Sequence, residues 1–212
     1  ALAEIKARAL SSSADVLIHA NDAVAVLWDV WAGTTRTVDL ADALHDVTVA
    51  TVSPGGRFLA IYGKNSEEKR AIAVYPAQEG AGLIPRIVLQ HDVHEMAGPG
   101  DASDREEDFV LSEMLLSADG RRLAVSYTYA EDFVRVWNVT EGTDITPYCL
   151  QGLVATNRER GCQVSNTDSV ALSADGGLLA VSDGGVTQLF DLSKDRAAPP
   201  LKVLTKVSVA SL

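Results

Sequence analysis

The chain has 212 residues and a formal net charge of −11, and 47% of its residues are hydrophobic against 22% charged. This length and composition are those of one globular domain. The acidic balance argues against a nucleic-acid or anionic-membrane surface, since both need clustered Lys and Arg. No apolar run approaches the roughly 18 residues that a membrane helix needs, so we expect neither nucleic-acid nor membrane partners.

One pattern occurs four times in chain order: a serine turn, a small apolar strand, and a second strand that ends in an aromatic residue. The first unit, about residues 4–40, has an imperfect turn at Ser11, reaches Trp28 and continues into a last strand over 35–40. The second unit, about residues 47–90, begins its turn at Ser53, reaches Tyr75 and ends in a strand over 85–90. Both read as strands because Val, Ile and Leu alternate with small or polar residues.

The third and fourth units, about residues 109–150 and 167–206, are the clearest copies. Their turns read Ser-Ala-Asp-Gly, in which the glycine supplies the positive φ of a tight hairpin. They lead to Trp137 and Phe190, and we expect their last strands over 145–150 and 201–205. Residues 207–212 match the start of the fourth unit and predict the first strand of a further one.

The spacing is steady inside the units and variable between them. The turn serines Ser11, Ser53, Ser117 and Ser173 lie 42, 64 and 56 residues apart, whereas each serine precedes its aromatic by 17 to 22 residues. This is the pattern of loop insertions on a fixed scaffold. Four antiparallel strands per unit of about 40 residues predict the blade of a β-propeller.

The segments VLWDV at 26–30 and VRVWNV at 134–139, with their serine turns, resemble Trp-Asp (WD) repeats. Leu44-His45-Asp46 and Gln90-His91-Asp92 resemble the Gly-His element of that family. The resemblance covers about residues 4–212 and implies an all-β propeller of four-stranded antiparallel blades, with aromatic residues packed between blades. The repeat residues that it implies are Trp28, Asp29, His45, Tyr75, His91, Trp137, Phe190 and Asp191.

The sequence begins and ends inside a unit, so we expect the four blades to belong to a larger propeller of about seven blades. The remaining blades would lie in a longer parent or in a second chain, in preference to a closed four-bladed ring. Similar arrays form the C-terminal propeller of larger bacterial signalling proteins, and the resemblance suggests such a parent.

Three insertions, over 63–71, 91–108 and 151–167, fall on the same face of such a scaffold. Loops on a rigid scaffold are where recognition concentrates, so this face is the candidate partner surface. Its partner would be a protein, or a sibling domain or chain that completes the propeller. The candidate contact residues are Lys64, Lys69, Arg70, Asp101, Asp104, Glu106, Glu107, Arg158 and Arg160.

We find no pattern for catalysis, for a cofactor or for a metal. His91 and His94 have a gap that suits a metal, but the position of His91 in the repeat favours a structural role. Cys149 and Cys162 either form a disulfide in a secreted protein or, as we favour, are free thiols in a reducing cytoplasm.

The sequence therefore predicts a non-enzymatic cytoplasmic interaction module, scaffold or sensor. The alternative is a propeller that gates or assists a hydrolase. That alternative needs acidic residues on several first strands if a channel cation is involved, and only Glu113 is acidic there. Trp31, at a turn on the opposite face, is either an exposed contact or folded back onto its own blade.

Overall fold

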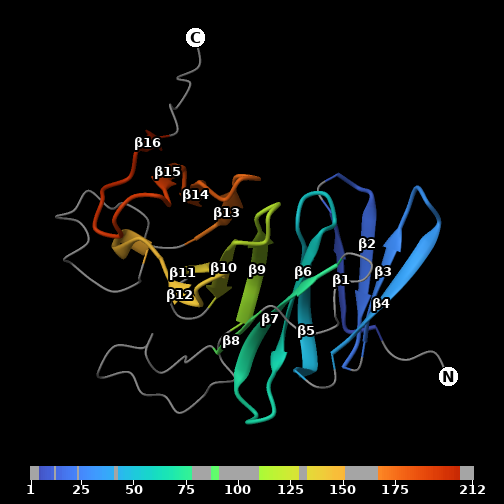
Figure 1. Ribbon diagram of the computed structural model, residues 1–212. Helices are drawn as coiled ribbons and strands as arrows, with labels where there is room; N and C mark the ends of the chain where they lie inside the picture. Colours follow the sequence, from blue (N-terminus) through green and yellow to red (C-terminus); the bar gives the residue numbers. More distant parts are fainter. Residues whose placement is uncertain are drawn as a thin grey trace.

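The computed structural model describes residues 5–11, 13–22, 24–40, 43–77, 87–90, 110–128, 133–150 and 167–205. These residues form four antiparallel sheets of four strands each, with one short 3-10 helix and no α-helix among them. We number the sheets 1 to 4 in chain order. Figure 1 shows them following one another, from sheet 1 in blue to sheet 4 in orange and red. The predicted all-β fold of four-stranded antiparallel units is confirmed.

Within each sheet the strands lie in sequence order, so every strand pairs with its neighbours along the chain. Sheet 1 consists of β1 (Ala7–Leu10), β2 (Val16–Ala20), β3 (Val24–Asp29) and β4 (Thr34–Asp39). Sheet 2 consists of β5 (His45–Val52), β6 (Phe58–Lys64), β7 (Arg70–Pro76) and β8 (Ile87–Gln90). Sheet 3 consists of β9 (Val110–Leu116), β10 (Arg122–Thr128), β11 (Phe133–Asn138) and β12 (Thr143–Asp144). Sheet 4 consists of β13 (Ser169–Leu172), β14 (Leu178–Asp183), β15 (Val186–Asp191) and β16 (Lys202–Thr205).

The last strand of sheet 3 differs from the prediction of a strand over 145–150. Strand β12 ends at Asp144, and a 3-10 helix follows at Tyr148–Leu150. Pro147 has no N–H for a strand ladder. The hydroxyl of Thr146 accepts the N–H of Val136 at 2.8 Å. A side chain therefore replaces the backbone carbonyl that would accept this N–H if the strand continued.

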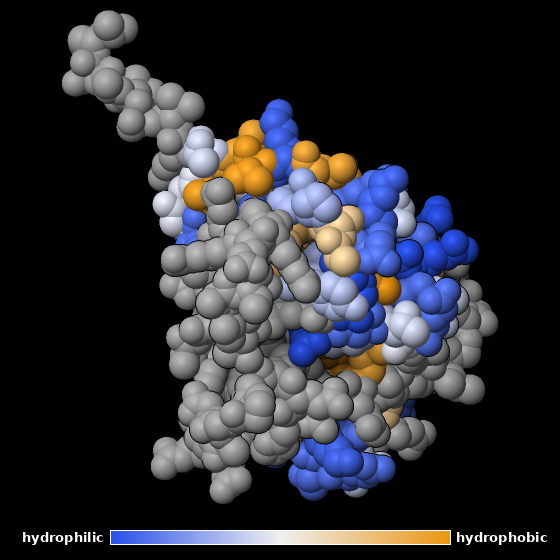
Figure 2. Space-filling view, turned by 90° about the vertical axis from the view of Figure 1, so that its left-hand side faces the viewer, coloured by the Kyte–Doolittle hydropathy of each residue, from blue (hydrophilic) through white to orange (hydrophobic). Residues whose placement is uncertain are grey.

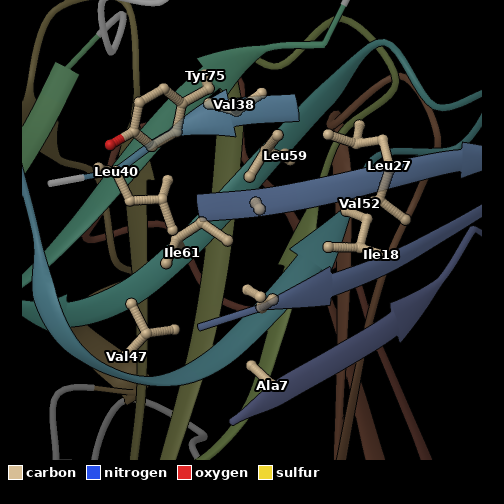
Figure 3. Packing of buried hydrophobic residues seen from close by; sticks show 14 of the residues in the cluster. Ala7, Ile18, Leu27, Val38, Leu40, Val47, Val52, Leu59, Ile61 and Tyr75 are labelled. Carbon is tan, nitrogen blue, oxygen red and sulfur yellow. The ribbon is translucent and has the colours of Figure 1, made fainter. Parts of the chain in front are cut away.

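Three apolar clusters hold the sheets together, one between each consecutive pair. We call the face of a sheet that meets the following sheet its forward face, and the opposite one its rear face. In the first cluster, Ile18 and Leu27 on the forward face of sheet 1 meet Leu59, Ile61 and Tyr75 on the rear face of sheet 2 (Figure 3). Burial of this surface, at about 25 cal/mol per Å², is the main force that joins neighbouring sheets.

The aromatic residue of each unit lies on a rear face. Tyr75, Trp137 and Phe190 are only 1%, 7% and 2% exposed, because each packs against the sheet before its own. Trp28 holds the same position in sheet 1 and is 43% exposed. The prediction that all four aromatics are core residues is therefore wrong for Trp28, whose sheet has no preceding sheet among the described residues.

The recurring serine closes the turn between the first two strands of every sheet. Its hydroxyl accepts the backbone N–H of the residue five positions later, at 2.9 to 3.0 Å in all four units. These pairs are Ser11 with Val16, Ser53 with Phe58, Ser117 with Arg122, and Ser173 with Leu178. The serine is thus the local signal that sets where the second strand begins.

Candidate partner-binding surface

The two ends of each sheet carry different connections. In a sheet with sequential antiparallel strands, the serine turn and the link from third to fourth strand lie at one end. We call this the turn end. The link from second to third strand, and the link to the next sheet, lie at the opposite end, which we call the loop end. Within the insertion predicted at 63–71, residues 65–69 form the link between β6 and β7 at the loop end of sheet 2, whereas residues 63–64 and 70–71 pair within those strands.

One buried side chain fixes the shape of this insertion. Asn65 is only 8% exposed, and its side-chain oxygen accepts the N–H of Glu67 at 2.9 Å and that of Lys69 at 3.1 Å. Glu68 between them has a φ of 61° and donates its N–H to the carbonyl of Asn65 at 3.0 Å. The charged side chains of the loop are therefore carried on a defined backbone.

An ion-pair network joins this loop to the beginning of sheet 2. Lys64 Nζ lies 3.3 Å from Asp46 and 4.0 Å from Glu68, and His45 Nε2 lies 3.0 Å from Glu68 Oε1. These side chains are between 30% and 71% exposed. Each pair at such exposure adds at most about 1 kcal/mol of stability, so its main effect is to position the side chains.

The network extends into sheet 1. Lys6 Nζ lies 2.6 Å from Asp22 and 3.8 Å from Asp46. The other oxygen of Asp22 accepts the N–H of Val47 at 2.9 Å, which ties the β2–β3 turn to sheet 2. The hydrogen bond from Lys6 is the largest cause of a lowered pKa at Asp22, so this carboxylate is charged at neutral pH. The loop ends of sheets 1 and 2 thus form one connected charged surface, the loop-end rim.

The structure distinguishes the three described candidate contact residues. Lys64 is engaged in the rim, and Lys69 lies 3.0 Å from Glu67 with both side chains 59% exposed. Arg70 instead packs inward: its guanidinium carbon is 5.6 Å from the ring centre of Tyr62, and its Nη1 is buried without a hydrogen-bond partner. Arg70 is therefore less available to a partner than the sequence predicted. The other candidates, Asp101, Asp104, Glu106, Glu107, Arg158 and Arg160, lie outside the described residues, as do His91 and His94.

Sequence reasoning missed Lys6, Asp22 and Asp46 as members of this surface. They lie far apart in the sequence, and only the stacking of sheets 1 and 2 brings them together. A usable signal was present, because Asp22 and Asp46 each stand at a strand boundary on the loop end.

The repeat residues have local roles that the structure makes clear. Asp29 accepts the N–H groups of Trp31 at 3.1 Å and Ala32 at 2.8 Å, and Asp191 accepts that of Ser193 at 2.9 Å. Both close the turn after the third strand. His45 bonds Glu68 on the surface, and Trp31 is 82% exposed at the turn end.

Metal-ligating side chains and one small hollow bear on other kinds of site in the described part of the chain. No group of three or more His, Cys, Asp or Glu side chains there could hold a metal ion. A hollow lined by Ile145, Phe190, Lys194 and Arg196, among others, has a volume of about 20 Å³. That is about the space of one water molecule, far below the size of a small-molecule site.

The state of Cys149 differs from the sequence expectation. Cys149 is disulfide-bonded and 6% exposed, so the favoured reading of two free thiols is wrong for this residue. The second cysteine, Cys162, lies outside the described residues. Disulfides persist mainly in oxidising compartments, so the argument for the cytoplasm that rested on free thiols is lost. Among the described residues, no helix has the length and apolar character that a membrane crossing requires.

Comparison with known proteins bears on the fold alone. No model of a known protein family matches the sequence, and no curated protein matches it either. Among solved structures, the chain is similar to hydrazine synthase of Kuenenia stuttgartiensis, with 13% identity and a TM-score of 0.50 over 87% of this chain. The match covers 52% of that protein's chain, so the present chain spans about half of its length.

Proposed function

We propose that the chain is a non-catalytic interaction module, a scaffold or sensor that binds a protein partner through its loop-end rim. Its four sheets would be blades of a WD-repeat type propeller with about seven blades in all. Support comes from the repeated serine turn, from the sequential four-stranded sheets and from the face-to-face clusters between them. No cofactor is part of this proposal.

The observation that carries the proposal is the loop-end rim itself. Three links from two sheets are held together there by Lys6, Asp22, Asp46, Lys64 and Glu68. Lys69 and Glu67 project beside them with more than half of each side chain exposed. A rigid scaffold that presents adjacent charged loops offers a partner both shape and electrostatic selectivity.

A photo-crosslinking experiment tests this use of the rim. A photoreactive amino acid is placed at Lys69, and as a matched control at Glu141, which is exposed in a turn at the turn end of sheet 3. Irradiation in the native host should give an adduct of one discrete mass from position 69. The adduct should weaken when Lys64→Glu disrupts the rim.

Position 141 should give no adduct of that mass. Equal adducts from both positions, or no adduct from position 69, would remove the support for a partner at the loop end.

A further inference from the structure

The forward face of sheet 4 differs from the three other forward faces. In sheets 1 to 3, the paired second- and third-strand residues on this face are at most 1% exposed. These pairs are Ile18 with Leu27, Ala60 with Val74, and Ala124 with Val136. The equivalent pair in sheet 4, Ala180 with Leu189, is only partly buried.

Exposed apolar side chains surround this pair. Leu178 is 39% exposed and Leu204 is 49% exposed. Figure 2 shows hydrophobic atoms gathered beside the grey C-terminal trace, at the level of sheet 4. Leu204 lies on the forward face because it pairs with Thr187, which is on the same face as Leu189, whereas Val203 pairs with the buried Gln188 on the rear face. Apolar side chains left exposed together on one face of a sheet indicate a contact surface.

A glycine contact recurs at all three joints between sheets. The glycine three positions after the turn serine lies against the residue where the second strand of the preceding sheet begins. A Cβ on Gly56 would lie 2.4 Å from Val16, one on Gly120 2.5 Å from Phe58, and one on Gly176 2.7 Å from Arg122. At these distances only glycine lets the two sheets approach this closely.

In sheet 4, Leu178 is the residue equivalent to those that contact the glycines. It is five positions after Ser173, just as Val16, Phe58 and Arg122 follow their own serines. Its side chain is therefore placed to contact the turn glycine of a following sheet. The exposed face thus continues a joint that the chain already uses three times.

The turn of sheet 1 does not fit this position, which argues against a second copy of the chain. The equivalent residue there is Ala14, which holds the same left-handed conformation with a φ of 57°. Its Cβ would occupy the space that Gly56, Gly120 and Gly176 leave open. Sheet 1 of another copy would therefore clash at Leu178.

We propose that the forward face of sheet 4 binds a further sheet of the same repeat, one whose first turn reads Ser-x-x-Gly and whose rear face is apolar. The turn glycine of that sheet contacts Leu178, and its aromatic residue covers Ala180 and Leu189. This inference rests on the propeller arrangement of the proposed function, but it concerns a surface other than the loop-end rim.

The test adds such a sheet to the chain. A second copy of residues 167–205 is appended after residue 212, and urea unfolding is compared with that of the original chain. If the added sheet docks, the unfolding midpoint rises by about 1 M or more, because several apolar side chains become buried. Two variants of the extended chain check the contact: Gly176→Leu in the appended copy only, and Leu178→Asp in the original sheet.

Each variant should return the midpoint to that of the original chain. In the original chain, Leu178→Asp should leave the midpoint nearly unchanged, since this side chain is already exposed. The proposal is overturned if the extended chain shows no shift, or if the shift survives both substitutions. It is also overturned if light scattering shows that the original chain forms a dimer that Leu178→Asp dissociates.

These outcomes are independent of crosslinking at the loop end. If position 69 gives no adduct, the unfolding comparison still tests the forward face of sheet 4. If the extended chain shows no shift, the crosslinking still tests the loop-end rim.

Discussion

The hydroxyl of Ser117 accepts the backbone N–H of Arg122 at 2.9 Å and donates to the carboxylate of Asp119 at 2.7 Å. Ser117 is fully buried, so no water can replace its hydroxyl. The same two bonds occur at Ser173, which bonds Leu178 and Asp175 but is partly exposed. One motif thus stands in two environments, which makes it a matched pair for mutation.

We expect Ser117→Ala to lower the free energy of unfolding by about 1–3 kcal/mol, because it leaves a sheltered N–H without an acceptor. Ser173→Ala should cost less than about 1 kcal/mol, because water can reach the freed N–H of Leu178. Urea unfolding of the two variants beside the original chain measures both values. Equal losses at the two positions would show that burial of the serine is not what gives the motif its strength.

A second matched pair tests the glycine contact between sheets 2 and 3. Gly55 and Gly120 both have a positive φ, of 79° and 67°, but a Cβ on Gly55 would meet nothing within 4 Å. Gly55→Ala should therefore cost only the left-handed strain, about 1–2 kcal/mol. Gly120→Ala should cost more, because its Cβ would also press into the ring of Phe58.

The additional loss in Gly120→Ala should shrink in the background Phe58→Ala, where the ring is absent. A double-mutant cycle on unfolding free energies gives this coupling directly. Additive effects of the two substitutions would contradict the contact.

Local features of this fold were readable from the sequence, and features that depend on neighbouring sheets were not. The serine turns could be placed because Ser117 and Gly120 act within a few residues of each other. The exposure of Trp28 could not be inferred, because its pattern matches that of Trp137 and only the presence of a preceding sheet separates them. The strand over 145–150 was misplaced because a side chain, Thr146, takes a ladder bond that the pattern assigns to the backbone.

The same distinction between local features and features that depend on sheet packing applies to the candidate surface. The insertion at 63–71 was found because a run of charged residues separates the second and third strands of the second unit. The rim that surrounds it was missed, because Lys6 and Asp46 are 40 positions apart and meet only through sheet packing. For Arg70, charge alone does not tell whether a side chain points outward or packs on a ring such as that of Tyr62.

The disulfide at Cys149 predicts a thiol count. The chain has two cysteines, so one bridge within the chain leaves no thiol to react. We expect no alkylation by iodoacetamide in urea without a reductant, and two alkylated cysteines after reduction, as read by intact mass. Reduction should also lower the unfolding midpoint, since a cross-link restricts the unfolded chain. A chain that is fully alkylated before reduction would return the cysteines to the reading as free thiols.

The three tryptophans give a direct test of which sheet faces are covered. Trp28 is 43% exposed and Trp31 82% exposed, whereas Trp137 is 7% exposed in the joint between sheets 2 and 3. Iodide quenches only indoles that it can reach, so it should quench the fluorescence of Trp28 and Trp31 and spare that of Trp137. Trp137→Phe should therefore raise the quenchable fraction of the emission, and Trp31→Phe should lower it. If Trp28 proves as protected as Trp137, another surface covers the rear face of sheet 1 in solution.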